Sequence, residues 1–278
     1  MTKLPEQKLP VKLIALDLDD TLLNSNTQIT DKTVNALQKA SERGIYIVLC
    51  SGRAEHGILP YVRRLDIAGR ETGRYLIAVN GCSIYDMHER KQIYKRTVSS
   101  DILLHANEEA EKLGLRTEVY SPDTIYYREE NKWTKLDVDL CKLKGEVVSD
   151  YESFLTKGFV KMLIPGEPET LQILQKKLKA DFGEHAVVFT SKPFFLEILP
   201  PHCGKGEAIC FLSEKLGIAP VNTMGFGDSM NDESMIRLCG NGVCMCNGLD
   251  YIKNIANYVT ELDNNHDGVG DFVEKYVL

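Results

Sequence analysis

The sequence predicts an α/β protein built around a parallel sheet, with an α+β module inserted into it. Short apolar runs at residues 11–16, 45–50 and 221–227 alternate with segments of helical periodicity, which is the pattern of strands joined by crossover helices. Glycines close helical segments, as in Leu113-Gly114 and Leu216-Gly217. A chain of 278 residues with 43% hydrophobic residues can form a packed core and also hold an inserted domain.

The first strands and the helix between them follow from the apolar pattern. The run 11–16 has no polar alternation, so we expect a strand that is buried on both faces. Thr30 is a suitable N-cap for a helix that extends to Arg43. Gly44 then supplies the stop before the strand at residues 45–50.

The middle of the chain has a different character, which begins with a hairpin predicted at residues 84–94. From about residue 98 to 198 the pattern predicts a helix, two strands, a helix, a strand, a helix and two strands. We therefore assign residues 1–86 and 198–278 to the core and residues 87–197 to an inserted cap. The aromatic residues of this module either contact a substrate or, as we favour, pack a small sheet: Tyr120, Tyr126, Tyr127 and Trp133.

Composition argues against several classes of partner. A net charge of −7 and a pI near 5.5 argue against a surface for nucleic acid or anionic lipid. The first ten residues lack the apolar core of a signal peptide, and no apolar stretch approaches the ~18 residues of a membrane span. We therefore expect a cytoplasmic protein. The eight cysteines form no C-x-x-C pair and are expected to be reduced; Cys239, Cys244 and Cys246 could ligate zinc but fit small buried hydrophobes better.

Acidic residues crowd together where the first predicted strand ends, in Asp17-Leu18-Asp19-Asp20-Thr21. Two unit charges about 4 Å apart repel by roughly 4 kcal/mol at an effective dielectric constant near 20. Such a cluster calls for a cation or a proton between the carboxylates. The alternative is a solvated acidic turn, because Asp is common in turns.

Three other segments carry polar residues next to predicted elements. Ser51-Gly52-Arg53 follows a strand and offers a hydroxyl group and a glycine amide to an oxyanion such as phosphate. Asp228 and Asp232 lie four residues apart where a helix opens, and oxygen ligands of this kind favour Mg²⁺. Helix capping would explain Asp228 alone. Lys205 begins a predicted helix, where the macrodipole disfavours a cation by up to about 1 kcal/mol, so it is either functional or a surface lysine.

Together these segments resemble the signature of the haloacid dehalogenase superfamily of phosphohydrolases, and more narrowly its Cof-type branch, subfamily IIB. The order of the D-x-D-[GD]-T, Ser, Lys and G-D-x-x-x-D motifs matches, and Asn80-Gly81 and Asp267-Gly268-Val269 match as well. The resemblance spans nearly the whole chain. Two features are less usual for the family: Asp20 stands where glycine is more common, and Cys244 and Cys246 lie in a segment that usually has small apolar residues.

This resemblance implies a Rossmann-like core with an inserted α+β cap of the C2 type. It also implies a Mg²⁺-dependent phosphatase that hydrolyses small phosphorylated metabolites, either sugar phosphates or phosphorylated cofactors. Asp17 would attack phosphorus and become an aspartyl phosphate, and Asp19 would act as acid and then as base. Ser51 and the Gly52 amide would hold phosphoryl oxygens, and Lys205 would neutralise negative charge.

The resemblance also implies the remaining site residues. Arg53, Asn80, Gly81 and Asn231 would complete the phosphate and substrate site together with Ser51, Gly52 and Lys205. The metal site would consist of Asp17, Asp19 through its backbone carbonyl, and Asp228, with Asn231 and Asp232 in support.

Two other functions stay open from the sequence alone. A phosphomutase of the same superfamily would return the phosphoryl group to its substrate. A phosphoacceptor signalling domain also combines acidic residues with Mg²⁺, Ser or Thr, and Lys, but such domains lack the D-x-D motif and the long insertion. We expect a small-molecule partner, no nucleic acid and no membrane, and a monomer or small homo-oligomer.

Overall fold

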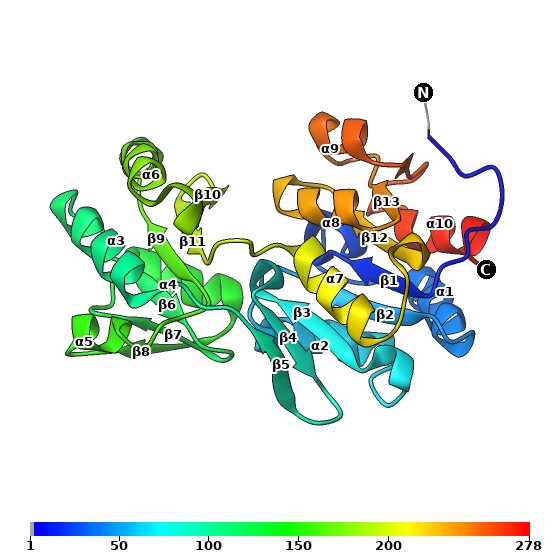
Figure 1. Cartoon of the computed structure of the whole chain (residues 1–278), viewed down its shortest axis with the longest axis horizontal. Helices are drawn as coiled ribbons and strands as arrows, with labels where there is room; N and C mark the ends of the chain where they lie inside the picture. Colours follow the sequence, from blue (N-terminus) through cyan, green and yellow to red (C-terminus); the bar gives the residue numbers. More distant parts are fainter. Residues whose placement is uncertain (1–2) are drawn as a thin grey trace. The chain divides into compact units, whose positions relative to one another are not determined.

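The computed structural model describes residues 3–278 and divides into two compact units, each with its own sheet and helices (Figure 1). The first unit contains Ile58–Tyr94, Gly204–Leu278 and the described chain up to Gly52, and the second contains Arg53–Gly57 and Lys95–Cys203. Within residues 3–278, no helix has the length and apolar character needed to cross a membrane.

The first unit is built on an eight-stranded sheet. Strands β14 to β3 are parallel in this order, and β4 pairs with β3 in the antiparallel sense. Strand β1 lies in the middle, because Leu13 pairs with both Tyr46 and Thr223. In sheet order the strands are β14 (Tyr258–Val259), β13 (Asn241–Cys244), β12 (Thr223–Gly227), β1 (Leu13–Leu16), β2 (Tyr46–Cys50), β3 (Tyr75–Ala78), β4 (Ser83–Asp86) and β5 (Lys91–Lys95).

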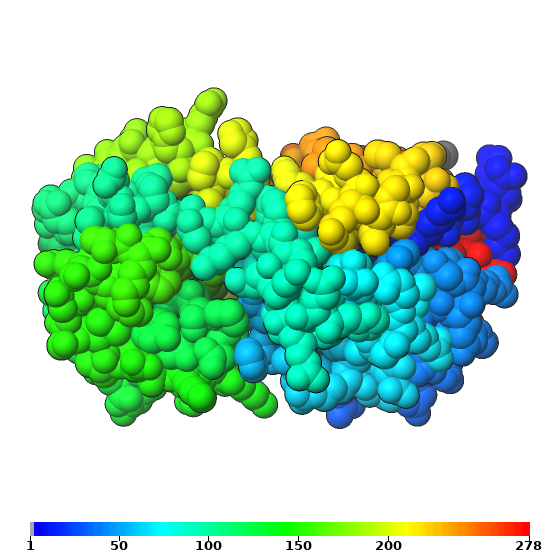
Figure 2. Space-filling model, turned by 60° about the horizontal axis from the view of Figure 1, so that its bottom comes forward, coloured from blue at the N-terminus to red at the C-terminus, as the bar shows by residue number. Residues whose placement is uncertain are grey.

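Helices cover both faces of this sheet, as the buried runs of the parallel strands require. Leu13 and Ala15 face a cluster that includes Ala208 of α7. On the other face Phe226 meets Phe272 of α10 edge-on, with ring centroids 5.5 Å apart. Figure 2 shows the outer side of α7, in yellow, at the surface. The helices are α1 (Asp31–Glu42), α2 (Glu55–Leu65), α7 (Lys205–Lys215), α8 (Glu233–Leu238), α9 (Asp250–Ile255) and α10 (Gly268–Tyr276).

Local signals place these elements as the sequence predicts. The hydroxyl oxygen of Thr30 accepts a hydrogen bond from the Thr33 amide at 3.4 Å and so caps α1. Gly44 has a φ of +83°, the left-handed conformation that ends many helices. Short turns follow or precede the strands: η1 (Leu18–Leu22), η2 (Glu71–Gly73), η3 (Val79–Gly81), η4 (Gly183–His185), η5 (Pro220–Asn222) and η6 (Met230–Asp232).

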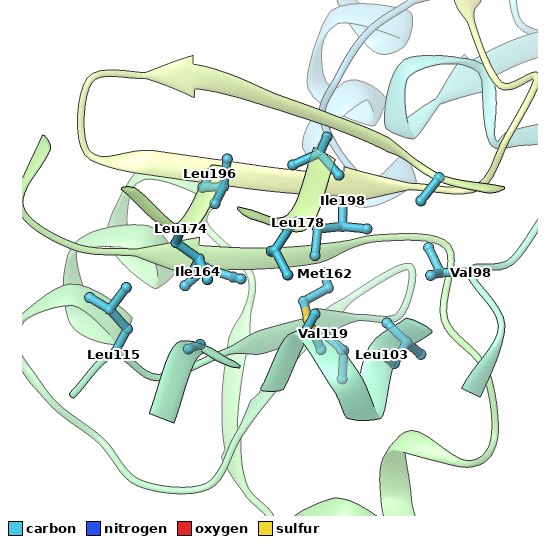
Figure 3. Close-up of a cluster of buried hydrophobic side chains, with 14 of the residues drawn as sticks. Val98, Leu103, Leu115, Val119, Met162, Ile164, Leu174, Leu178, Leu196 and Ile198 are labelled. Carbon is cyan, nitrogen blue, oxygen red and sulfur yellow. The ribbon is translucent and has the colours of Figure 1, made fainter. Parts of the chain in front are cut away.

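The second unit is an α+β module with a six-stranded sheet. Figure 3 shows residues of the central strands, such as Val119, Met162 and Ile198, packed with Leu103 of α3 and Leu178 of α6. In sheet order the strands are β10 (Val187–Lys192), β11 (Phe195–Leu199), β9 (Met162–Pro165), β6 (Glu118–Tyr120), β7 (Thr124–Tyr127) and β8 (Lys144–Val147). The helices are α3 (Ser100–Lys112), α4 (Lys132–Cys141), α5 (Tyr151–Leu155) and α6 (Pro168–Phe182).

This unit holds one strand and one helix more than the sequence pattern predicts. Strand β8 is exposed along its whole length and pairs only with β7 within the described chain, so it has no apolar alternation to reveal it. Helix α5 has five residues, which is too short for a helical period to be recognised.

The cysteines follow the expectation of reduced thiols only in part. Six are free: Cys50, Cys141, Cys210, Cys239, Cys244 and Cys246. Cys82 and Cys203 are disulfide-bonded, which corrects the sequence-based expectation for these two residues. Burial of Cys239 and Cys244 agrees with their interpretation as small hydrophobic residues.

Candidate active site

The carboxyl ends of three neighbouring strands bring the candidate residues together. Strands β2 and β12 flank β1, with Leu16 paired to Leu49 and to Phe226. Asp17, Ser51 and Asp228 follow the last residues of these strands. Open α/β sheets bind their ligands at this edge, which is where the sequence predicts the site.

Lys205 forms the centre of the site. Its Nζ donates hydrogen bonds to Oδ1 of Asp17 and, at 2.6 Å, to Oδ1 of Asp232. Lys205 and Asp232 are completely buried, and Asp17 is 5% exposed. Lys205 is therefore not a surface lysine, and the two carboxylates explain why a cation is tolerated at the start of α7.

Burial and charge shift the pKa values of this group strongly. Burial, followed by the repulsion of Asp232, raises the pKa of Asp17 well above its ordinary range, against the attraction of Lys205. The same two causes raise the pKa of Asp228 to about 7. Burial acts to lower the pKa of Lys205, but Asp17 and Asp232 outweigh it and raise this pKa. The carboxylates thus have too little positive charge near them, which favours a further cation.

A divalent cation fits the oxygen atoms that are present. Asp17, Asp228 and Asp232 each offer an atom within 4.8 Å of the others, and within residues 3–278 this is the only such group of His, Cys, Asp and Glu side chains. Carboxylate oxygens without thiolate or imidazole suit Mg²⁺. The thiols of Cys239, Cys244 and Cys246 belong to no such group in the described chain.

Asp232 has a second task, which is to shape the loop after β12. Its Oδ2 accepts hydrogen bonds from the amides of Asp228 at 2.9 Å and Ser229 at 3.1 Å. A Cβ atom on Gly227 would lie 2.4 Å from Cβ of Asp232, so only glycine fits there. Asp228 and Asp232 therefore meet through this capping turn, and not on one face of a regular helix as the i, i+4 spacing suggests.

The turn after β1 holds the other acidic residues. Asp19 is exposed, with an extended backbone (φ −69°, ψ 130°). Asp20 has a φ of 58°, a conformation that glycine adopts freely and Asp tolerates, which explains why glycine is usual at this position. Thr21 Oγ1 donates a hydrogen bond to Asp228 Oδ1 at 2.8 Å, and the Asn247 side chain donates to the Asp20 carbonyl at 2.8 Å.

The turn after β3 lies against the end of β2. The amide of Asn80 donates a hydrogen bond to the Ser51 carbonyl at 2.9 Å. A Cβ atom on Gly52 would lie 3.0 Å from Asn80 Oδ1. Gly81 adjoins the start of α7, since its own Cβ position would be 2.1 Å from the Gly204 carbonyl oxygen.

The Asn231 side chain donates to Asn80 Oδ1 at 3.1 Å, so Asn231 also belongs to the site. Arg53 lies in the second unit, and its contact with phosphate stays a prediction. Sequence reasoning assigned no role to Thr21, Ser229 or Asn247. The first two lie inside the recognised motifs, which could have indicated them, whereas nothing in the sequence points to Asn247.

These observations define a class of protein. A buried carboxylate held by a buried lysine, beside oxygen ligands for a divalent cation and at the carboxyl edge of a parallel sheet, suits an enzyme that works on phosphorylated compounds. The chain belongs to the haloacid dehalogenase-like hydrolase family, whose family model matches residues 14–273. The family expected from the motifs is thereby confirmed.

Relatives and solved structures agree with this assignment. The chain is 30% identical to an HMP-PP phosphatase of Serratia proteamaculans, covering 88% of this chain and 87% of the relative. It is 29% identical to the 5-amino-6-(5-phospho-D-ribitylamino)uracil phosphatase YcsE of Bacillus subtilis, covering 96% of both. The crystal structure of a haloacid dehalogenase-like hydrolase from Bacteroides thetaiotaomicron, 30% identical, superposes with a TM-score of 0.86 over 95% of this chain and 98% of the other. The chain is thus an enzyme of a family that includes named phosphatases.

Proposed function

We propose that this protein is a Mg²⁺-dependent phosphatase that hydrolyses small phosphorylated metabolites through an aspartyl phosphate on Asp17. The hydrogen-bonded contact of buried Lys205 with Asp17 and Asp232 supports this most directly. A carboxylate held by a lysine at the carboxyl edge of the sheet is suited to attack phosphorus, because the lysine offsets the repulsion between two anions.

The first step forms the bond between an Asp17 carboxylate oxygen and phosphorus while the bond from phosphorus to the leaving oxygen breaks. Asp19, exposed beside Asp17, gives its proton to the leaving oxygen. In the second step Asp19 takes a proton from water, the water oxygen bonds to phosphorus, and the bond between phosphorus and Asp17 breaks. Inorganic phosphate leaves, and Asp17 and Asp19 return to their starting states.

The other residues hold the phosphoryl group and balance its charge. Ser51, the Gly52 amide, Asn231 and Lys205 donate hydrogen bonds to its oxygens. Asp17, Asp228 and the Asp19 carbonyl would hold Mg²⁺, which when bound supplies positive charge to the phosphoryl oxygens. Asp232 keeps Lys205 in place and supports the loop that presents Asp228.

The second unit is proposed to act as a cap that selects the leaving group. The named relatives act on compounds of different kinds, HMP-PP in one case and a phosphoribitylamino-uracil in another. An inserted module can differ in shape between relatives while the residues that carry out the chemistry stay the same, which would account for this difference in substrate. We infer that the substrate of this protein is a small phosphorylated metabolite, either a sugar phosphate or a phosphorylated cofactor.

The test is release of inorganic phosphate from a panel of phosphorylated metabolites, with Mg²⁺ or with a chelator. We expect metal-dependent release by the wild type and a loss of at least about 10³-fold in Asp17→Asn. Asp250→Asn is the matched control, because the Asp250 side chain is 95% exposed and lies outside the site. Appreciable release by Asp17→Asn would exclude Asp17 as the nucleophile, and a stable phosphoryl adduct without release would indicate a mutase or an acceptor domain.

A further inference from the structure

A short chain of side-chain hydrogen bonds joins two loops of the site. Ser229 Oγ donates to Asn231 Oδ1 at 2.7 Å, and Asn231 Nδ2 donates to Asn80 Oδ1 at 3.1 Å. Asn80 and Asn231 are 151 residues apart in the sequence and come from the turns after β3 and β12. The Asn231 amide is thus held at both of its polar atoms.

The remaining hydrogen of the Asn231 amide has a fixed direction. A primary amide carries two N–H donors, and one of them is used by Asn80. Ser229 orients the oxygen end, and the Asp232 amide in turn donates to the Ser229 hydroxyl in a capping box. The second N–H of Asn231 therefore cannot turn away unless these hydrogen bonds break.

Asn80 is itself held firmly. Asn80 is 6% exposed, and its backbone amide donates to the Ser51 carbonyl at 2.9 Å. Val79, Asn80 and Gly81 all have positive φ angles, of 51°, 51° and 93°. Such a conformation is unfavourable for a β-branched residue like Val79 and persists only where the surroundings fix it. The turn is therefore a rigid support and not a mobile loop.

We propose that Asn80 is a positioning residue, which acts by orienting the second N–H of Asn231 towards the phosphoryl group. This inference rests on the proposed function, since it needs a phosphoryl group at the site. It differs from a direct contact between Asn80 and the substrate, because here Asn80 acts only through its carbonyl oxygen on Asn231.

A double-mutant cycle tests this proposal. Asn231→Ala removes a donor to the phosphoryl group and is expected to lower kcat/KM by about 10²-fold. Asn80→Gly removes the side chain but keeps a residue that accepts a positive φ, and we expect a loss of about tenfold. If Asn80 acts only through Asn231, the double variant loses no more than Asn231→Ala alone. Losses that multiply would overturn the proposal and favour a direct contact.

The matched control is Asp66→Gly, because Asp66 is an exposed residue of the first unit with the same φ of 51°. It should leave kcat/KM unchanged and show what a change to glycine at such a position does to stability. If Asn80→Gly lowers kcat/KM no more than this control does, the side chain of Asn80 positions nothing.

A second readout does not depend on activity. The two side-chain NH₂ protons of Asn231, assigned by their absence in Asn231→Ala, are inequivalent in any asparagine, and the hydrogen bond to Asn80 should shift one of them further downfield in the wild type. In Asn80→Gly that proton should move upfield, while the other proton changes less. Unchanged signals would refute the role of Asn80 even if no substrate is found. Shifted signals in a protein without Asp17-dependent phosphate release would count against the proposed function instead.

Discussion

Glu118 of β6 offers the sharpest test of the electrostatic reasoning, because it is a completely buried carboxyl group of the second unit and is not one of the candidate active-site residues. Among residues 3–278, no hydrogen-bond donor reaches either of its carboxylate oxygens. Its neighbour Asp137 on α4 accepts hydrogen bonds from the Tyr120 hydroxyl and, at 3.3 Å, from the Cys141 thiol. Burial and then the charge of Asp137 raise the pKa of Glu118 to about 9. At neutral pH the Glu118 carboxyl group of the folded protein is therefore protonated, and it can donate a hydrogen bond to the Asp137 carboxylate.

The sign of the effect follows from proton linkage. The pKa of Glu118 is higher in the folded chain than its ordinary value of 4.5, so folding takes up a proton between these values. The contribution of Glu118 to the free energy of unfolding is therefore most favourable below pH 4.5 and becomes less favourable as the pH rises towards 9. A pH of 7.5 lies about three units above the ordinary pKa of a glutamate side chain. At 1.36 kcal/mol per unit, protonating Glu118 on folding at this pH costs at most ~4 kcal/mol.

Glu118→Gln should remove this cost, because glutamine has the same shape and its amide can donate to Asp137 without taking up a proton. We expect the free energy of unfolding to rise by ~2–4 kcal/mol at pH 7.5 and to change little at pH 5. Unfolding by urea can be followed by the fluorescence of Trp133, the sole tryptophan, which lies on α4 with Asp137 and so reports on the second unit.

Glu109→Gln is the control of opposite sign. Its hydrogen bond with Lys112 lowers the pKa of Glu109, so this group stabilises the fold above the ordinary pKa of 4.5. Its loss should therefore weaken the fold at neutral pH and have less effect as the pH falls. A difference between Glu118→Gln and the wild type that is the same at pH 5 and pH 7.5 would refute the buried-proton argument.

Three further substitutions test the first unit. Gly81→Ala places a Cβ atom 2.1 Å from the Gly204 carbonyl oxygen at a φ of +93°. It should therefore lower the free energy of unfolding by more than ~2 kcal/mol, and an unchanged melting temperature would contradict this close contact. Asp232→Asn leaves Lys205 with one charged partner, Asp17. We expect kcat to fall at least tenfold in phosphate-release assays. An unchanged kcat would show that Asp17 alone is sufficient to hold the lysine. Asp20→Gly relieves a φ of 58° and should change the free energy of unfolding by less than ~1 kcal/mol with activity kept; a large loss of activity would assign the Asp20 side chain a role in the reaction.

The sequence was sufficient for the fold class because its signals are local. The apolar run at Leu13–Leu16, the Thr30 cap and Gly44 each act within a few residues, and the structure confirms them. Strand β8 was missed because an exposed edge strand has no apolar pattern. Its position depends on pairing with β7, which the local sequence does not encode.

The candidate site shows the same limit. Motif order indicated Asp17, Lys205 and Asp228, which the structure brings together at one sheet edge. It did not reveal that Asp232 binds Lys205 and two amides at once, because this depends on the three-dimensional path of the loop. The hydrogen bond between Asn80 and Asn231 was equally invisible, since no spacing rule connects residues so far apart in the chain.

The position of β1 in the sheet has a consequence for how the chain folds during synthesis. Strand β1 pairs on one side with β2, which follows soon after it, and on the other with β12 (Thr223–Gly227). The whole of Lys95–Cys203 leaves the ribosome before β12 does. During that time the second unit can fold on its own sheet, while one edge of β1 has no strand beside it.

An unpaired strand edge of this kind is a site for wrong pairing with other chains. Because β1 is completely buried in the finished protein, its four residues have no polar side chain to discourage such pairing. Slow synthesis between residues 95 and 223 should therefore favour aggregation. Fast completion of the chain, or a chaperone bound to the first strands, should protect the nascent protein.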